Sequence, residues 1–191
     1  AGINTPGNDV VLTLNSKIQQ AAQDALAGEV GACVVMDPET GAVLALASSP
    51  TYNAADVESL IKQTDSASGS ELYNRATQAL YAPGSTFKTV VAAAALETGQ
   101  YQTDTQIPAG ASYTLPGTTV QLTNATSQGN GSDGKISLED AMAYSSNTAF
   151  AQLGVSLGDD KVSSMAKKLG FDSSITVDGT DSSGTPWMTV A

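Results

Sequence analysis

Serine and lysine at the spacing Ser-x-x-Lys are the residues of this sequence that could supply a nucleophile and its base. Residues three apart on a helix lie on one face, with their Cβ atoms about 5–6 Å apart, so the ammonium nitrogen can reach the hydroxyl. The lysine must be neutral to take the proton, which requires burial or a neighbouring cation. Such a pair would be a serine nucleophile activated by a neutral lysine.

The spacing alone is weak evidence, because it occurs four times, at Ser59-Leu60-Ile61-Lys62, Ser85-Thr86-Phe87-Lys88, Ser132-Asp133-Gly134-Lys135 and Ser164-Met165-Ala166-Lys167. Ser132 lies in a Gly- and Asn-rich stretch beside Asp133, which favours a turn and a solvated, charged lysine. Ser164 falls within an amphipathic helical pattern whose lysines read as its solvated face. We therefore interpret these two copies as structural.

The copy at Ser85 has a different context. It follows Pro83-Gly84 and opens a helical pattern, where free N–H groups stabilise developing negative charge. Gly84 would let a substrate or another backbone approach closely. Apolar neighbours such as Phe87 would lower the pKa of Lys88. From the residues alone, a catalytic pair and a capping serine beside a surface lysine are both open.

A second polar element, Ser145-Ser146-Asn147, interrupts an apolar helical region. Three adjacent hydrogen-bonding side chains need partners if they are buried. They could belong to a site, or Ser146 or Asn147 could simply cap the next helix.

Composition excludes several kinds of chemistry. The 191 residues contain no His and one Cys, with 8 Lys plus Arg against 19 Asp plus Glu, for a net charge of −11. Imidazole-based triads and His-ligated metals are therefore impossible, as are intrachain disulfides. An acidic chain is a poor nucleic-acid binder. No metal or cofactor is predicted.

The hydrophobic pattern predicts the elements that must position these residues. We expect a strand at 10–14, a helix from about 16 to 26, and a hairpin of 32–36 and 42–47 around a Pro- and Gly-containing turn. Further helices are expected at 54–63, 85–97, 138–142, 147–157 and 159–168, and the first turn of another at 186–191. Residues 100–135 show no periodicity and are expected to be a long irregular insertion. No apolar run reaches a membrane-spanning length, and no signal peptide is visible.

The ordered set of motifs resembles the transpeptidase domain of penicillin-binding proteins, most closely the monofunctional class B, penicillin-binding protein A-like type. The matching stretches lie at 9–15, 18–22, 37–53, 74–76, 81–88 and 145–147. The resemblance implies an α/β (α+β) fold of the penicillin-binding protein and serine β-lactamase kind, with a helical subdomain and the N-terminal strands of an antiparallel sheet.

The resemblance also implies site roles. Ser85 would be the acylated nucleophile, Lys88 its base, Ser145 the proton relay to the leaving amine, and Asn147 a hydrogen-bonding partner of Lys88 and substrate. Gly84 and Ser146 would contribute to substrate binding. The substrates would be peptidoglycan stem peptides, β-lactams would acylate the serine, and division or elongation proteins are possible partners.

One family motif is absent, since no lysine here is followed by Ser or Thr and then Gly. We therefore expect residues 1–191 to be a partial transpeptidase domain lacking its C-terminal strands. Such a chain should acylate poorly and could self-associate through an exposed sheet edge. Its parent is expected at the extracytoplasmic face of the bacterial membrane, anchored by an N-terminal helix outside this chain.

Two other functions stay open at this point. A β-lactamase or β-lactam sensor domain would share the fold and the Ser-x-x-Lys pair. A non-catalytic module that binds cell-wall peptide or division partners is the other alternative.

Overall fold

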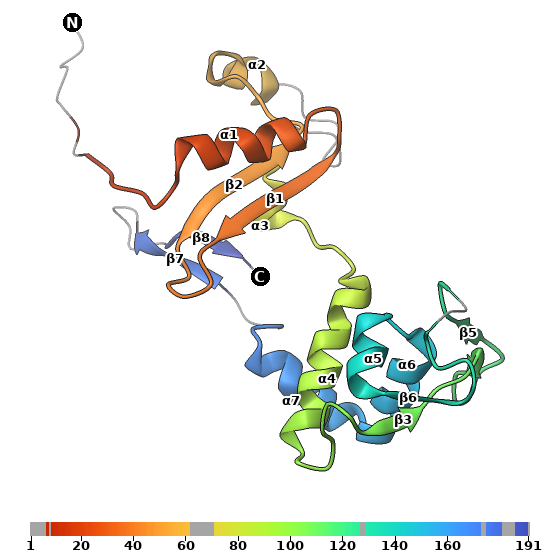
Figure 1. Ribbon diagram of the computed structural model, residues 1–191. Coiled ribbons are helices and arrows are strands. Elements are labelled where there is room, and N and C mark those ends of the chain that lie inside the picture. The colour runs from red at the N-terminus through yellow and green to blue at the C-terminus, as the bar shows by residue number, and fades with distance from the viewer. Residues whose placement is uncertain are drawn as a thin grey trace, which may run out of the picture. The chain divides into compact units, whose positions relative to one another are not determined.

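A computed structural model of the chain describes residues 7, 9–61, 71–126, 129–172, 175–180 and 186–190, with side chains up to residue 172. It divides into two compact units, one formed by residues 1–80 and one beginning at Tyr81 (Figure 1). In neither described unit is a helix long and apolar enough to cross a membrane.

The first unit is built on helix α1 (Ser16–Ala25), which begins where predicted. The side chain of Asn15 accepts hydrogen bonds from the backbone N–H groups of Lys17 and Ile18, which otherwise lack helical partners. Gly28, at φ +86°, lies just beyond the helix end.

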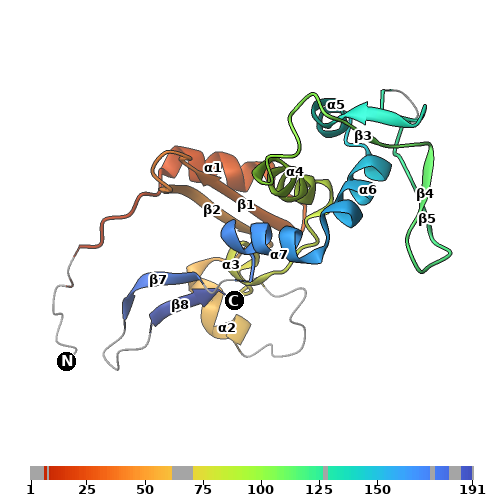
Figure 2. The same ribbon diagram turned by 90° about the horizontal axis from the view of Figure 1, so that it is seen from below.

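The predicted hairpin is confirmed as β1 (Gly31–Met36) and β2 (Val43–Ser49), an antiparallel pair. In the turn, Asp37 accepts hydrogen bonds from the Glu39 amide and the Thr40 hydroxyl, and these bonds lower the pKa of its carboxyl. Helix α1 covers one face of the hairpin (Figure 2). Ala22, Ala45 and Ala47 form the buried centre of this layer.

The predicted strand at 10–14 is wrong. Val10, Val11, Leu12 and Leu14 are exposed and form no ladder. The segment runs instead along the outer edge of β2, where the Thr13 hydroxyl donates to the Val43 carbonyl. Apolar β-forming residues become a strand only when another strand pairs with them. Here the contact with β2 is made by the side chain of Thr13 and not by a backbone ladder.

Helix α1 completes this edge. The Asn15 amide donates to the Leu44 carbonyl, and the Gln19 side-chain amide both donates to and accepts from the Leu46 backbone, at 3.1 and 2.7 Å. Because the Gln19 side chain makes both bonds that a neighbouring strand would make to Leu46, another strand cannot pair with this edge of β2.

Shorter elements complete the first unit. The helix predicted at 54–63 is a 3₁₀ turn, η1 (Ala54–Asp56), followed by α2 (Val57–Ile61); its last two residues lie outside the described part. Helix α3 (Arg75–Gln78) follows with Asn74 as its N-cap.

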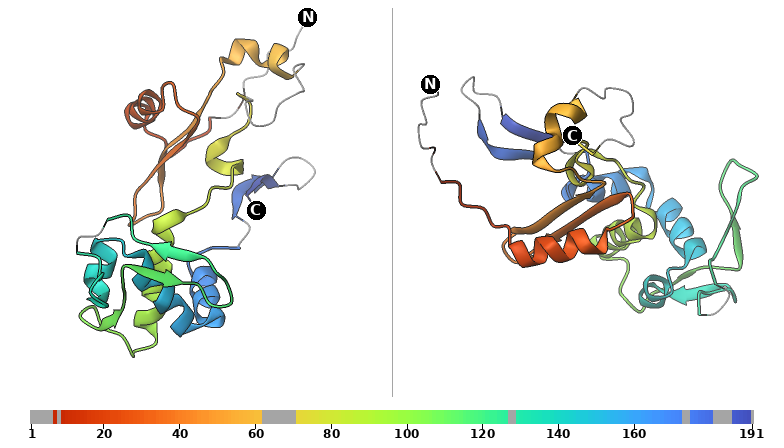
Figure 3. Two further views of the ribbon diagram at one scale, coloured as in Figure 1. Left: turned by 90° about the vertical axis from the view of Figure 1, so that its right-hand side faces the viewer. Right: turned by 90° about the horizontal axis from the view of Figure 1, so that it is seen from above.

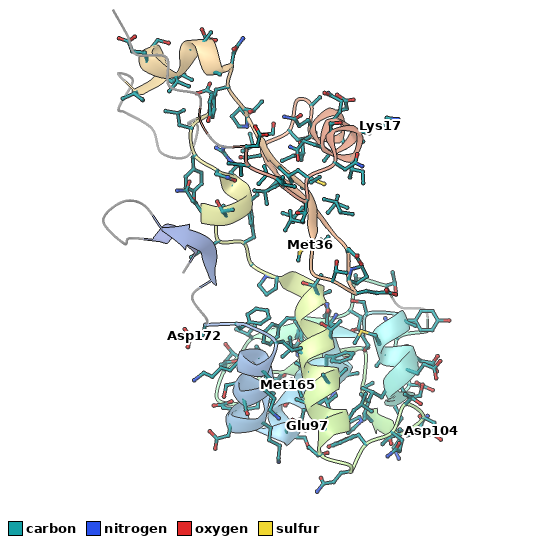
Figure 4. The ribbon with its side chains drawn as sticks, turned by 90° about the vertical axis from the view of Figure 1, so that its left-hand side faces the viewer. Lys17, Met36, Glu97, Asp104, Met165 and Asp172 are labelled. Carbon is teal, nitrogen blue, oxygen red and sulfur yellow. The ribbon has the colours of Figure 1, made fainter. Side chains whose placement is uncertain are left out.

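The second unit is organised around η2 (Gly84–Phe87) and α4 (Lys88–Glu97), which together match the helix predicted at 85–97. Around α4 lie α5 (Leu138–Ala143), α6 (Asn147–Leu157) and α7 (Asp159–Lys168) (Figures 1 and 3). Val90, Val91 and most alanines of α4 are buried, as expected of a helix surrounded by others. Figure 4 labels Met165, which α7 contributes to this core, and Glu97 near the end of α4.

Residues 100–135 are more ordered than predicted. They contain β3 (Gln106–Pro108), β4 (Ser112–Thr114), β5 (Gln121–Thr123) and the start of β6 (Lys135–Ser137). Strand β3 pairs with β6 and β4 with β5, both antiparallel. Strands of three residues are too short to show an alternating pattern, which explains the missed prediction. The β4–β5 hairpin extends away from the helices in Figure 2.

The C-terminal region differs from the prediction too. Residues 186–191 were expected to begin a helix, but Pro186–Val190 form strand β8, which pairs with β7 (Ile175–Thr180). Trp, Thr and Val in this stretch favour extended structure, and with a partner strand this preference prevails.

Candidate active site

Ser85 reaches Lys88 through the local geometry of a 3₁₀ turn. In such a turn, side chains three residues apart eclipse one another. Ser85 lies within η2 and Lys88 begins α4, so the lysine Nζ lies 3.2 Å from Ser85 Oγ and donates to it. Ser85 is exposed and Lys88 is half-buried, so the hydroxyl faces solvent while the base is partly shielded.

Gly84 enters this turn at φ +55°, which side chains with a Cβ rarely adopt. A Cβ built on Gly84 would meet no atom within 4 Å. We expected Gly84 to permit close approach of another group. No other backbone of the described chain approaches Gly84 that closely, and the positive φ is what requires glycine here. Close approach of a substrate stays a prediction.

Ser145 reaches the site at the junction of α5 and α6. Its N–H bonds to the Met142 carbonyl, and the N–H of Ser146 bonds to the Ala141 carbonyl. These two bonds define a Schellman motif, whose left-handed position is usually glycine. Here it is Ser145, at φ 53°.

Ser146 begins the next helix. Its Oγ accepts from the Ala149 N–H as the N-cap of α6 and donates to the Asn130 carbonyl at 2.7 Å. The side chain is 0% exposed. The prediction that Ser146 binds substrate is therefore wrong for its side chain, because every polar contact it makes is internal. The capping role left open by the sequence is the one observed.

These elements converge on the lysine. Lys88 Nζ donates to Ser145 Oγ and to the Ser145 carbonyl, both at 2.8 Å, and to Asn147 Oδ1 at 2.6 Å. Ser145 Oγ in turn donates to Ser85 Oγ at 3.1 Å. Four of the predicted residues thus form one hydrogen-bonded cluster, in which a proton can pass between two hydroxyls and one amine.

Burial lowers the pKa of Lys88 below its ordinary value. Phe87 and Phe150 line an apolar groove beside it, and Nζ lies 6.0 Å from the Phe150 ring centre. The ring and the surrounding oxygens favour the charged amine, whereas loss of water disfavours it. The net direction favours a base that loses its proton more readily than an exposed lysine.

The Ser-x-x-Lys copies at Ser132 and Ser164 stay apart from the cluster, and the lysine of the copy at Ser59 lies outside the described residues. Ser132 and Lys135 are exposed near β6, and Ser164 and Lys167 are exposed on α7. Among the described residues, no group of His, Cys, Asp and Glu could hold a metal ion.

Two residues of the cluster's support escaped the sequence analysis. Asn147 Nδ2 donates to the Thr123 carbonyl at 2.9 Å, and Asn124 Oδ1 accepts from the Thr148 N–H at 3.1 Å. A backbone carbonyl carries no sequence signal. Asn124 lies within an Asn-Ala-Thr triplet, and nothing in that triplet indicates a contact with α6.

Comparison with known proteins gives consistent results. Residues 31–188 match the family model of the penicillin binding protein transpeptidase domain. Peptidoglycan D,D-transpeptidase PbpA of Mycobacterium tuberculosis is 40% identical over 185 residues, covering 90% of this chain and 38% of the relative. Peptidoglycan D,D-transpeptidase MrdA of Escherichia coli K12 is 33% identical, covering 86% of this chain and 26% of the relative. The chain thus spans less than half the length of either relative.

Solved structures agree. The D,D-transpeptidase domain of a peptidoglycan glycosyltransferase from Eggerthella lenta is 50% identical with a TM-score of 0.77, covering 87% of this chain and 39% of that one. An imipenem acyl-enzyme complex of penicillin-binding protein A from M. tuberculosis is 38% identical with a TM-score of 0.73, covering 84% and 40%. The predicted fold class is confirmed, and the chain belongs to the penicillin-binding protein transpeptidase family.

Proposed function

We propose that this chain carries the serine–lysine part of a peptidoglycan D,D-transpeptidase, with Ser85 as the acylated nucleophile. One observation carries the proposal: a single half-buried lysine lies within hydrogen-bond distance of Ser85 Oγ, Ser145 Oγ and Asn147 Oδ1. The names of the relatives support this reaction over hydrolysis of β-lactams or simple binding.

Acylation begins when neutral Lys88 takes the proton of Ser85 Oγ. The oxygen then attacks the carbonyl carbon of the penultimate D-alanine of a stem peptide, forming a tetrahedral oxyanion. The backbone N–H of Ser85, at the start of η2 and α4, is available to donate to this oxyanion. The exposed position of Ser85 allows a peptide to reach it.

Breakdown of the oxyanion needs a proton on the leaving amine. Ser145 Oγ lies between the two groups, 3.1 Å from Ser85 Oγ and 2.8 Å from Lys88 Nζ. It passes its proton to the terminal D-alanine nitrogen and regains one from Lys88. The C–N bond breaks, and the donor peptide stays on Ser85 as an ester.

Transfer reverses these roles. An acceptor amine gives a proton through Ser145 to Lys88 and attacks the ester carbonyl. As the ester C–O bond breaks, Lys88 returns a proton to Ser85 Oγ, which frees the serine and completes the cross-link. Asn147 holds Lys88 and offers its remaining amide hydrogen to the substrate. A β-lactam enters the same path, and opening of its ring leaves the amine tethered. Acyl-enzyme complexes of the related penicillin-binding protein A support this step.

The test is mass spectrometry of the full-length protein after incubation with penicillin. We expect an adduct on the peptide containing Ser85, absent in Ser85→Ala and retained in Ser164→Ala, the serine of another Ser-x-x-Lys copy. An adduct on a different residue, or none, would refute the proposal.

For the 191-residue chain alone we propose slow acylation. Without the Lys-Ser/Thr-Gly strand it would lack one oxyanion donor, which costs about 100–1000-fold in rate. Fluorescent penicillin should label the chain far more slowly than the full-length protein. Equal labelling rates would contradict this.

We also propose that the chain alone self-associates through β1, whose described partner is β2 only. The backbone N–H and C=O of Leu46 bond to Gln19 and not to β1. Its paired residue Val34 therefore has its backbone N–H and C=O on the opposite side, at the outer edge of β1, where another strand could bind them. Light scattering that shows only monomers at high concentration would contradict this.

A location at the extracytoplasmic face follows from the proposed substrate, since peptidoglycan lies there, and the parent would be anchored by a helix preceding this chain. Division or elongation proteins are proposed as partners, because they would direct a peptidoglycan-synthesising enzyme to its place in the cell wall. Protease accessibility in intact spheroplasts would test the location.

A further inference from the structure

The first turn of α6 has two separate caps. The N–H groups that begin a helix lack partners within it. Ser146 Oγ accepts from the Ala149 N–H, as a local N-cap does. The Thr148 N–H bonds instead to Asn124 Oδ1 at 3.1 Å, from a residue that directly follows β5 and lies 24 positions earlier. The helix that carries Asn147 is thus fastened from outside its own sequence.

The other end of the Asn124 side chain is bound as well. Its Nδ2 donates to the Gly110 carbonyl and to Thr148 Oγ1, both at 3.2 Å. Thr148 is 0% exposed, and its hydroxyl also donates to the Gly110 carbonyl, at 2.8 Å. A backbone N–H can only donate and a carbonyl can only accept, so the orientation of the amide is fixed. Position 124 therefore requires a short side chain that carries both a hydrogen-bond donor and an acceptor, as asparagine does.

This attachment determines where the next carbonyl lies. Thr123 immediately precedes Asn124, and its carbonyl accepts from Asn147 Nδ2 at 2.9 Å. Because Nδ2 is held there, Oδ1 of the same amide faces Lys88 Nζ at 2.6 Å. One peptide linkage, from Asn124 to Thr123, and two hydrogen bonds, from Asn147 to Thr123 and from Lys88 to Asn147, thus link Asn124 to the lysine without direct contact.

We infer that Asn124 is a positioning residue of the active site, which holds β5 against α6 and so fixes the orientation of Asn147 toward Lys88. The inference rests on the proposed function. It concerns the rate of acylation rather than substrate affinity, since none of the contacts of Asn124 faces the nucleophile.

The first test is Asn124→Ala in the full-length protein. Small displacements of catalytic groups cost up to about 100-fold in rate. We expect the first-order acylation rate by penicillin to fall about 10- to 100-fold, while the dissociation constant of the non-covalent complex changes little. The matched control is Thr118→Ala, in the β4–β5 turn, whose hydroxyl has its bonds to described residues within that turn, to the Leu115 carbonyl and the Val120 N–H. It should acylate at the wild-type rate.

Asn124→Asp is the sharper variant. An ionised carboxylate cannot donate to the Gly110 carbonyl, but a neutral carboxyl can donate there and accept from Thr148. Partial burial of position 124 should raise the pKa of the new carboxyl above its ordinary value of about 3.9. The ratio of the acylation rate of Asn124→Asp to that of the wild type should therefore rise as pH is lowered from about 8 toward that raised pKa. A loss of packing alone would give a constant ratio.

Amide hydrogen exchange supplies a readout that does not depend on activity. In Asn124→Ala the Thr148 amide should lose protection, while amides of α4 keep theirs. Wild-type acylation rates in Asn124→Ala, or unchanged protection of Thr148, would overturn the inference. Absence of acylation in the wild type would instead refute the proposed function, and the exchange experiment would still decide whether Asn124 holds α6.

Discussion

Two short segments bring a serine hydroxyl to the same lysine, and they do so in opposite ways. The segment at Gly84–Lys88 is local: a 3₁₀ turn eclipses Ser85 with Lys88, three residues apart. The segment at Ser145–Asn147 is distant in sequence, and Ser145 reaches the lysine across 57 residues at the junction of two helices. The first pair depends on helical register, whereas the second depends on tertiary packing.

The difference extends to the backbone. Both segments contain a residue in the left-handed region, Gly84 at φ +55° and Ser145 at φ 53°. Glycine adopts this conformation without steric cost, but serine does not. The junction therefore carries a local destabilisation in order to aim one hydroxyl, and the turn does not. Replacing Ser145 by glycine and Gly84 by alanine should therefore change stability in opposite directions, while both lower activity.

The largest expected effect comes from the group that both segments share. Lys88→Met should lower the acylation rate of the full-length protein by about 1000-fold, because the base is lost. Its thermal stability should be retained, since a half-buried amine is replaced by an apolar side chain of similar length. Lys167→Met, from another Ser-x-x-Lys copy, is the control and should acylate normally. A comparable loss of acylation rate in both variants would show that Lys88 is not the specific base of the reaction.

Ser145→Gly should separate activity from stability. Loss of the hydroxyl should slow acylation by about 100-fold or more, as for other general acid–base groups. Relief of the left-handed strain should raise the free energy of unfolding by about 1 kcal/mol. Ser145→Ala should be equally slow but less stable than Ser145→Gly, as measured by denaturant unfolding. If glycine gave no more stability than alanine, the strain argument would fail.

The pH dependence of acylation should report the burial of Lys88. The base acts only when neutral, so the rate should rise about tenfold per pH unit and level off above the pKa of the lysine. Because burial lowers this pKa, the plateau should begin below the ordinary lysine value of about 10.4. Lys88→Arg, which cannot lose its proton, should show no such rise. A plateau at or above the ordinary value would contradict the burial argument.

Gly84→Ala should have the smallest effect of the four. The new Cβ meets no neighbouring atom, so only the unfavourable φ remains, at about 1 kcal/mol of stability. Acylation should fall only a few-fold as Ser85 shifts. Gly154→Ala, within α6 and equally free of neighbours, lacks the positive φ and should instead be neutral or stabilising. Melting temperatures of the two variants provide the measurement.

Much of the positioning framework was predictable because its signals are local. Asn15 and Ser137, which are residue types favoured at helix N-caps, cap α1 and α5, and glycine at 158 ends α6. The hairpin of β1 and β2 followed from two apolar runs around a Pro- and Gly-containing turn. Two predictions failed because pairing decides whether a segment is a strand. Residues 10–14 were predicted as a strand but form no ladder, and residues 186–190 were predicted as a helix but pair as β8.

The sequence by itself determined the candidate nucleophile and base, since composition left no histidine and a three-residue spacing aligns Ser85 with Lys88. It also singled out Ser145 and Asn147 within a polar element, and the family resemblance implied their roles. The tertiary structure alone decided that Ser146 is buried, that Ser145 is strained, and that Thr123 and Asn124 support the site. Helical register is a property of neighbouring residues, whereas a hydrogen bond between a loop carbonyl and a distant amide exists only after the chain has packed.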